Sequence, residues 1–459
     1  MRSVSTILAT VTAVGLLSCL PAAPMAMAVM PQTPAPVAGA SPDFDGDGLA
    51  DIVYGLNGEV TEGAVRVVYG SGRTQEITRG VGDDMSSDFG RVILARDFNG
   101  DGYCDLAVTD SPYYLTSRSA TIVIILGSAE GLEETADRSY AAPAGARQFG
   151  LSLAFLSAPS RLLVVGAEQA DVPGGSLAAY PIGSDGLPSG SPFWINQSSA
   201  GVPGTAESGD RFGEAVAASG STLVVGVPGE DIGKIKDAGN VVLLTYAGGQ
   251  RFSGVAYGQN SAGVPDKAEA YDEFGASVAI GRGVVAVGVP GEEKQGGLVQ
   301  LFTLSGSKLK PLAAIDQNSS GVPGVGERHD RFGAAVAIAE VCAGKTGVVV
   351  GGPGESFLTG EDGAAWVIPV KRTSSCKARL IAENGILGGT LARDGRKLGS
   401  VVAVLNHVGT TPDTVLVGLR GSEDVGLGRL YAVAAPYTAG HVAWSDTNID
   451  NLWGFALSR

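Results

Sequence analysis

The sequence predicts an all-β fold, a seven-bladed β-propeller, and three observations support this prediction. Glycine makes up 69 of the 459 residues, while aromatic residues make up only 6 %. The glycines separate short runs of Val, Ile, Leu and Ala, a pattern typical of many short strands joined by tight turns. A Phe-Gly pair also returns about every 60 residues, and a spacing of this size indicates stacked supersecondary units.

The repeated unit has a fixed internal order. The pairs are Phe89-Gly90, Phe149-Gly150, Phe212-Gly213, Phe274-Gly275 and Phe332-Gly333, followed by the diverged pair Leu398-Gly399. In the fourth unit an alternating strand at 214–218 is followed by strands at 223–227 and 240–246. Three or four strands per unit, without helical periodicity between them, fit a propeller blade better than a βαβ unit. We expect each Phe to fill the wedge between blades and each Gly to let neighbouring backbones approach closely.

The two ends of the chain complement each other. The first unit begins at Asp43 and has strands at 52–55 and 64–69, but no Phe-Gly strand precedes them. Near the C-terminus, residues 450–457 resemble residues 209–216, with Trp453-Gly454 in place of Phe-Gly. We therefore predict that this last strand completes the first blade and closes a ring of seven blades.

The N-terminal segment predicts export. An apolar stretch follows Arg2 and ends near an Ala-x-Ala cleavage site, so residues 1–28 are assigned as a secretory signal peptide. Residues 29–42 form a Pro/Ala-rich linker, and residues 43–459 form the propeller. An alternative is a lipid anchor at Cys19, which lies in a loose lipobox. No later stretch reaches the ~18 apolar residues of a membrane helix, so we expect a secreted monomer without a membrane span.

Charge and cysteine content narrow the functional classes. The chain has 32 Lys and Arg against 47 Asp and Glu, and this acidic balance argues against nucleic-acid binding, which needs a basic surface. Export permits disulfides. Cys342 and Cys376 fall within one repeat and can pair, which would leave Cys104 as a free, buried thiol.

Two acidic segments have the ligand spacing of calcium loops. The first places side chains at positions 1, 3, 5 and 9 and a backbone carbonyl at position 7, from Asp43, Asp45, Asp47, Asp51 and Leu49. The second repeats the arrangement with Asp97, Asn99, Asp101, Asp105 and Tyr103. Ca²⁺ takes six to eight oxygen ligands, and alternation lets a curved loop aim every second side chain inward. We predict two structural Ca²⁺ sites; the alternative is a pair of acidic Asx-turns without metal.

The order of Phe-Gly, then Val-Val-Gly-Val-Pro-Gly at 224–229, then a Gly-led strand resembles the FG-GAP repeat of integrin α-chain propellers and their bacterial relatives. The resemblance extends from Asp43 to the C-terminus and implies calcium loops at strand-to-strand turns. An EF-hand would instead need Glu at position 12, where Tyr54 and Val108 stand. The Ala-Pro of the family appears here as Val-Pro or Gly-Pro, and it is lost in the first three units and the seventh.

Units four to six share a further motif in the loop before Phe-Gly. An Asn- and Ser-containing segment ends in Val-Pro nine residues before Phe, at 196–203, 260–265 and 318–323. Glutamate stands five residues before Phe and aspartate two before it: Glu207, Glu269 and Glu327, and Asp210, Asp272 and Asp330. One interpretation is that these residues cap turns and accept backbone hydrogen bonds. The other is that three similar loops form a polar binding surface on one face.

No catalytic motif accompanies these features. The sequence lacks G-x-S-x-G and H-E-x-x-H, and its three histidines are scattered. We expect a secreted, calcium-stabilised module for binding or adhesion, with an extracellular protein or glycan as partner, rather than an enzyme. The alternative is a secreted hydrolase with its active site in the propeller channel, for which paired carboxylates facing inward would be the signature.

Overall fold

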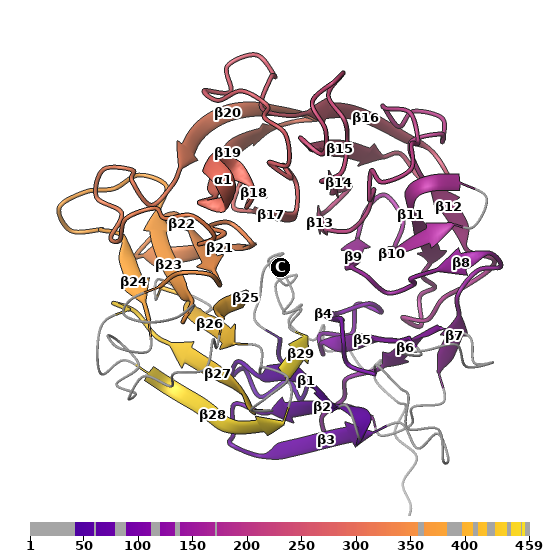
Figure 1. Ribbon diagram of the computed structural model, residues 1–459. Coiled ribbons are helices and arrows are strands. Elements are labelled where there is room, and N and C mark those ends of the chain that lie inside the picture. Colours follow the sequence, from indigo (N-terminus) through magenta and orange to yellow (C-terminus); the bar gives the residue numbers. More distant parts are fainter. Residues whose placement is uncertain are drawn as a thin grey trace, which may run out of the picture. The chain divides into compact units, whose positions relative to one another are not determined.

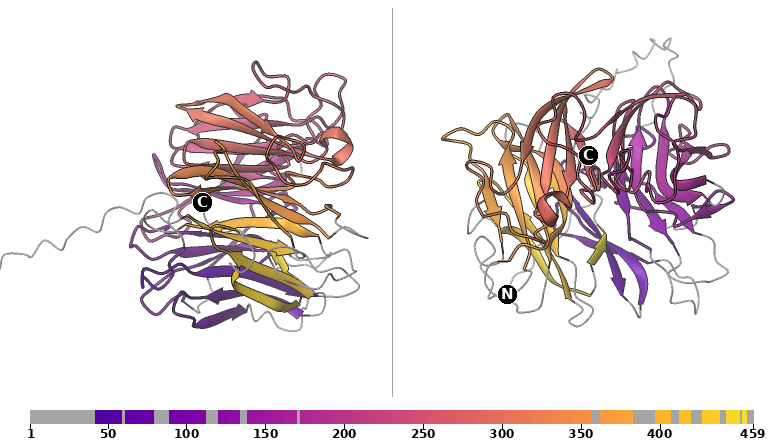
Figure 2. Two further views of the ribbon diagram at one scale, coloured as in Figure 1. Left: turned by 90° about the vertical axis from the view of Figure 1, so that its left-hand side faces the viewer. Right: turned by 45° about the horizontal axis from the view of Figure 1, so that its top comes forward.

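The computed structural model describes most of the chain from Pro42 onward, in the segments 42–58, 61–78, 89–111, 120–133, 138–169, 172–356, 362–382, 397–406, 412–419, 427–437, 442–450 and 452–454. The predicted signal peptide, the linker up to residue 41 and Cys19 lie outside these residues. Within the unit 38–459, seven sheets stand side by side in a ring (Figure 1), and the same sheets are seen edge on and tilted in Figure 2. The predicted all-β, seven-bladed propeller is confirmed.

Each sheet is one blade, built from strands that pair antiparallel. Blade 1 has the order β29 (Leu452–Gly454), β1 (Ile52–Gly58), β2 (Thr61–Val68), β3 (Thr74–Thr78). Blade 2 contains β4 (Ile93–Arg96), β5 (Asp105–Asp110), β6 (Thr121–Ile125) and β7 (Ser139–Ala141). In blade 3, β8 (Ala146–Arg147) and β9 (Leu153–Leu156) both pair with β10 (Leu162–Gln169), which is followed by β11 (Val172–Pro181) and β12 (Phe193–Ile195).

Blades 4 to 7 each contain four strands in chain order. Blade 4 consists of β13 (Val216–Ser219), β14 (Thr222–Val227), β15 (Asn240–Tyr246) and β16 (Phe252–Tyr257). Blade 5 consists of β17 (Ser277–Gly281), β18 (Val284–Val289), β19 (Leu298–Ser305) and β20 (Lys308–Ile315), with the single helical turn α1 (Glu292–Gln295) after β18. Blade 6 consists of β21 (Ala335–Cys342), β22 (Lys345–Gly352), β23 (Ala364–Pro369) and β24 (Arg379–Ile381). Blade 7 consists of β25 (Leu398–Leu405), β26 (Thr414–Leu419), β27 (Leu427–Val433) and β28 (Val442–Asp450).

The Phe-Gly pairs join neighbouring blades, as predicted. Phe274 is fully buried, and its backbone forms a parallel bridge with Gly239 at the start of the third strand of the preceding blade. The following Gly275 lies so close to Gly226 that a Cβ on Gly226 would come within 2.1 Å of the Gly275 carbonyl oxygen. The same bridge recurs between Gly297 and Phe332. Glycine is needed because any side chain would push adjacent blades apart.

A C-terminal strand completes the first blade, as predicted. Strand β29 pairs antiparallel with β1, with Gly454 opposite Gly55 and Leu452 opposite Leu56. Figure 1 shows β29 beside β1 at the inner side of blade 1, where the other blades have their first strands. The ring is therefore closed by strands from both ends of the propeller.

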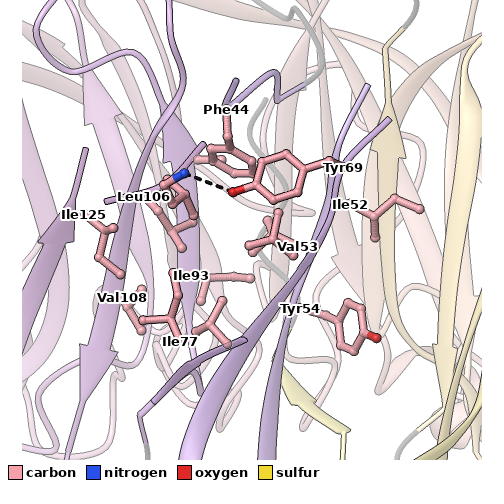
Figure 3. Packing of buried hydrophobic residues seen from close by; sticks show 14 of the residues in the cluster. Phe44, Ile52, Val53, Tyr54, Tyr69, Ile77, Ile93, Leu106, Val108 and Ile125 are labelled. Carbon is pink, nitrogen blue, oxygen red and sulfur yellow. Dashed lines mark hydrogen bonds between the residues drawn. The ribbon is translucent and has the colours of Figure 1, made fainter. Parts of the chain in front are cut away.

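The core consists of apolar clusters between neighbouring blades. One cluster contains Phe44, Val53, Ile93 and Leu106 and packs blade 1 against blade 2 (Figure 3). Within this cluster the Tyr69 hydroxyl accepts a hydrogen bond from the Leu132 backbone N–H at 3.0 Å. Each acidic loop is fixed by one buried phenylalanine: Phe44 belongs to this cluster, and Phe98 belongs to a second cluster that packs blade 2 against blade 3.

The long hairpin of blade 6 carries the disulfide. Cys342 at the end of β21 lies opposite Lys345 of β22, so a tight hairpin joins the two strands. Cys342 is bonded to Cys376, with 6.1 Å between the two Cα atoms. Cys104 is free and half-buried. Among the described residues, no helix is long and apolar enough to cross a membrane.

Candidate metal centres

The two acidic loops occupy equivalent places in neighbouring blades. Residues 43–51 lead into β1 of blade 1, and residues 97–105 join β4 to β5 of blade 2. The loops also contact each other, because the Cys104 N–H donates to the Asp43 carbonyl oxygen at 2.8 Å. The loop at 97–105 therefore lies at a strand-to-strand turn, as predicted, whereas the loop at 43–51 precedes β1 and follows no described strand.

The first position of each loop organises its turn. Asp43 accepts hydrogen bonds from the backbone N–H groups of Gly46, at 2.7 Å, and Gly48, at 3.0 Å. Asp97 accepts the equivalent bonds from Gly100 and Gly102, at 2.6 and 3.1 Å. The four glycines all have positive φ, between 70° and 97°, a region that favours glycine. The regular spacing of glycine in these segments is thus a backbone requirement.

The ninth position anchors each loop to its blade. Asp51 is fully buried, and its two oxygens accept the N–H of Phe44 at 2.6 Å and of Gly70 at 2.8 Å. Asp105 is also fully buried and accepts the N–H of Phe98 at 2.7 Å and of Gly127 at 3.0 Å. Each carboxylate therefore ties the start of the loop to the end of a neighbouring strand. This anchoring role goes beyond the metal-ligand role that the spacing predicts.

Positions three, five and seven differ more between the loops. Asp47 and Asp101 accept the N–H of Leu49 and Tyr103, at 2.7 and 2.9 Å, and these bonds form Asx-turns. At position three, the Oδ1 atom of Asp45 is buried and has no hydrogen-bond partner among the described residues. In the second loop, Asn99 instead donates to Asp101 at 2.8 Å. That the Leu49 and Tyr103 carbonyls are ligands stays a prediction.

The first loop gathers negative charge at one point. One carboxylate oxygen from each of Asp43, Asp45 and Asp51 lies within 4.8 Å of the others. Burial, together with the charges of Asp45 and Asp43, raises the pKa of Asp51 to about 7, against the lowering effect of its two backbone hydrogen bonds. Arg73 approaches Asp45 at 3.5 Å, but its side chain is 44 % exposed, so this ion pair is weak. An unpartnered carboxylate oxygen beside two further carboxylates fits a site for a hard cation.

The second loop shows the same electrostatic pattern. Burial, together with the charges of Asp101 and Asp97, raises the pKa of Asp105 to about 7. The hydrogen bonds from Gly127 and Phe98 oppose this rise. The loop therefore holds a buried carboxyl group that is costly to ionise unless a positive charge lies nearby.

The loops of blades 4 to 6 contain the predicted turn caps. Asp210, Asp272 and Asp330 accept the N–H of Glu207, Glu269 and Glu327, at 2.7, 2.5 and 2.6 Å. Sequence reasoning missed the partners of these aspartates. A buried glutamine six residues before the proline of Val-Pro and a glutamate directly after Pro-Gly lie beside each aspartate: Gln197 and Glu230, Gln259 and Glu292, Gln317 and Glu355. The recurrence of Pro-Gly-Glu in these three units was the signal that could have identified the glutamates.

A cavity of about 820 Å³ lies beside β3, the outermost strand of blade 1 in Figure 1, and not at the ring centre. Its wall includes Glu76 and Glu133. Glu76 forms an ion pair with Arg66 at 2.8 Å, and Glu133 forms one with Arg138 at 3.0 Å. These two carboxylates are thus paired with arginines, and Glu130 is a third carboxylate in the wall.

Comparison with known proteins supports the repeat assignment. Residues 202–243, which span most of blade 4, match the FG-GAP repeat family. This match and the seven blades together support an FG-GAP propeller protein. Comparison with curated protein sequences gives no significant match.

Solved structures offer only distant likenesses. A candidate 6-phosphogluconolactonase from Bacteroides uniformis is 8 % identical, with a TM-score of 0.47, over 87 % of this chain and 97 % of that one. A candidate 6-phosphogluconolactonase from Bacteroides fragilis is 11 % identical, with a TM-score of 0.47, over 90 % of this chain and 99 % of that one. A streptogramin B lyase is 12 % identical, with a TM-score of 0.38, over 82 % and 91 % of the two chains. At these values the likenesses support no inference about activity.

Proposed function

We propose that this chain is a secreted propeller scaffold in which Ca²⁺ rigidifies two loops and whose loop-rich surface binds an extracellular protein or glycan. The equivalence of the two loops is the observation that best supports calcium binding. Both bond a first aspartate to two glycine N–H groups and a ninth, buried aspartate to a phenylalanine N–H and a glycine N–H. Two independent copies of one detailed arrangement argue for a shared ligand.

In this proposal the loop carboxylates supply the ligand oxygens. Asp43, Asp45 and Asp51 would hold the ion of blade 1, with Asp47 and the Leu49 carbonyl completing the set. Asp97, Asn99, Asp101, Asp105 and the Tyr103 carbonyl would hold the ion of blade 2. A bound Ca²⁺ supplies positive charge that stabilises the ionised forms of the buried aspartates, so binding would stabilise the folded loops.

The predicted signal peptide and the FG-GAP repeats, which are typical of extracellular proteins, support the extracellular placement, and the scaffold supports the binding role. Propeller loops stand on rigid strands, and loops on a rigid support often carry recognition. A scaffold of this kind needs no catalytic group. The fold by itself does not determine the partner.

Calcium binding can be tested by equilibrium dialysis of the chelator-treated full chain against Ca²⁺, followed by metal analysis. The Asp47→Ala and Asp101→Ala variants should each lose one bound ion. Asp185→Ala is a matched control, since Asp185 is also an exposed aspartate that accepts the N–H two residues on, from Leu187 at 3.2 Å. Unchanged calcium content in both loop variants would refute the two sites.

The binding role can be tested with glycan and surface-protein arrays, probed with the full chain in Ca²⁺ and in EGTA. We expect a defined set of partners in Ca²⁺. The absence of any binding in both conditions, together with hydrolysis of a glycan or phosphoester substrate, would favour the enzyme alternative.

A further inference from the structure

Three equivalent polar clusters lie where blades 3 and 4, 4 and 5, and 5 and 6 meet. Each joins a glutamine that follows the outermost strand of one blade to an aspartate and a glutamate of the next blade. We name them the junction clusters: Gln197, Asp210 and Glu230; Gln259, Asp272 and Glu292; Gln317, Asp330 and Glu355. The glutamines all stand six residues before the proline of Val-Pro, so they are equivalent, whereas Asn196 and Asn260 are not.

The contacts within the clusters repeat. The side-chain amide of Gln197 donates to Glu230 at 2.7 Å, that of Gln259 donates to Glu292 at 2.5 Å, and that of Gln317 donates to Glu355. The aspartate of each cluster accepts the backbone N–H described above. Since these contacts join two blades, each cluster also ties neighbouring blades together.

Each glutamine leaves one polar atom without a partner. The Oε1 atoms of Gln197, Gln259 and Gln317 are buried and accept no hydrogen bond from the described residues. The three side chains belong to residues that are only 4, 2 and 2 % exposed. The Nε2 atom of the same amide donates to the glutamate carboxylate of each cluster. Buried acceptors are normally satisfied, and three equivalent exceptions call for a common ligand.

The clusters also carry unbalanced negative charge. Asp272 and Glu292 are 2 and 3 % exposed, and no salt bridge within the described segments reaches them. Burial, together with repulsion from Asp272, Asp266 and Glu269, raises the pKa of Glu292 to about 8. Burial and repulsion from Asp330 likewise raise the pKa of Glu355 to about 7.

The oxygen spacing fits one ion. In the blade 4–5 cluster, one carboxylate oxygen from each of Glu269, Asp272 and Glu292 lies within 4.8 Å of the others. Two ligands on opposite sides of a Ca²⁺ are about 4.6 to 5.2 Å apart, since each Ca–O bond is about 2.3 to 2.6 Å. A donor set made only of carboxylate and amide oxygens suits Ca²⁺ rather than softer metals.

We propose that each junction cluster is a Ca²⁺ site in which the glutamine Oε1, the aspartate and the glutamate are ligands. The sites differ from the acidic loops in sequence and in place. The loop of blade 2 joins the first strand to the second, whereas the junction clusters lie at the second-to-third turn and at the connection between blades. Because successive strands run antiparallel, these connections lie at opposite ends of the strands. The clusters would therefore form a row of ions on the opposite face of the ring.

The flanking blades support this assignment. Blade 3 has Arg147, two residues before Phe149, where blades 4 to 6 have aspartate. Blade 7 has Arg396, two residues before Leu398, at the same position of the repeat. In both blades the sequence replaces a ligand with a fixed positive charge, so the cation sites are restricted to blades 4 to 6.

The test is the calcium content of the chelator-treated full chain after dialysis. The wild type should bind three more ions than the triple variant Glu230→Gln, Glu292→Gln, Glu355→Gln. Glu292→Gln alone should lose one ion, and the matched control Glu293→Gln, at the exposed neighbouring residue, should lose none. The double variant Asp47→Ala, Asp101→Ala should keep the three junction ions, so failure of the loop sites and failure of the junction sites are distinguishable.

A protonated carboxyl group is the competing explanation for each cluster. It predicts that Glu292→Gln raises or preserves the thermal stability of the chain and leaves its calcium content unchanged. This pair of results would overturn the proposal. Should the triple variant not fold, Gln259→Met provides the second test, because it removes the Oε1 ligand without adding charge. A Gln259→Met chain that binds as much calcium as the wild type would also overturn the proposal.

Discussion

The acidic loops of blades 1 and 2 and the junction clusters of blades 4 to 6 concentrate carboxylates in different ways. In the loops, one short segment supplies all of the acidic groups, and backbone N–H groups hold most of their oxygens in place. In each cluster, the glutamine comes from one blade and the aspartate and glutamate come from the next. The glutamine keeps a buried oxygen without a partner among the described residues. Each acidic loop is thus organised by nearby residues, whereas a junction cluster depends on the packing of two neighbouring blades. The comparison predicts that stability and metal binding are coupled differently in the two regions.

The largest effect should follow deletion of residues 450–459, which removes β29. This deletion exposes the edge of β1 beside the first acidic loop and opens the ring. We therefore expect the free energy of unfolding to fall by more than about 4 kcal/mol. Deletion of residues 455–459 is the control, since it leaves β29 in place. Thermal unfolding at the wild-type temperature after the longer deletion would show that β29 does not hold the ring together.

Removal of the buried loop anchors should have the next largest effect. Asp51→Ala or Asp105→Ala leaves two buried backbone N–H groups without acceptors, which should cost about 2 to 5 kcal/mol in EDTA. Asp210→Ala, in a junction cluster, leaves one such group and should cost about 1 to 3 kcal/mol. Denaturant unfolding would measure the free energy that each variant loses. Equal losses for Asp51→Ala and Asp210→Ala would contradict the claim that the loop aspartates hold more backbone N–H groups in place than the cluster aspartates do.

The pH dependence of stability in EDTA should reveal the buried carboxyl group of the blade 4–5 junction cluster. The pKa of Glu292 is about 8 in the folded chain, above the ordinary value of about 4.3. Its protonated form therefore stabilises the fold fully below about pH 4, and this contribution is lost as pH rises through about 8. Glu292→Gln should show a smaller fall in unfolding free energy from pH 5.5 to pH 8 than the wild type. Identical pH profiles would mean that burial and the neighbours Asp272, Asp266 and Glu269 do not raise the pKa of Glu292.

The smallest effect should come from the exposed ion pairs beside the clusters. Glu273 contacts Arg211 at 3.0 Å and Arg331 at 3.7 Å, but these side chains are 28, 36 and 47 % exposed. Solvent weakens such pairs, so Arg211→Ala should cost about 0.2 to 1 kcal/mol and leave the calcium content unchanged. A loss of calcium in this variant would show that the ion pairs help to shape the neighbouring clusters.

Repetition explains how much of the fold was predictable. The Phe-Gly spacing identified six blades, and the resemblance of residues 450–457 to 209–216 identified the strand that completes the first. The positions of Asp43 and Asp97 in their loops were also predictable, because a local turn depends on nearby residues. The disulfide was only one of the possibilities that the sequence left open, and the structure pairs Cys342 with Cys376.

The junction clusters were less accessible to sequence reasoning. Gln259 and Glu292 are 33 residues apart and meet only because one ends a blade and the other turns between strands of the next. The Asn-Ser pattern drew attention to Asn196 and Asn260, although the buried ligand-like residue is the nearby glutamine. The glutamine stands out because its side chain is buried and its Oε1 atom has no partner among the described residues. Neither property can be seen in a single sequence.

The most direct test of this account is an anomalous difference map from crystals of the full chain grown with Ca²⁺ and measured at a long X-ray wavelength. The account predicts five peaks, two within the loops at 43–51 and 97–105 and three between the glutamine, aspartate and glutamate of the junction clusters. Peaks at the loops alone would contradict the junction sites. A map without peaks at either place, from crystals in saturating Ca²⁺, would contradict the claim that this propeller uses its carboxylates to hold ions on two faces.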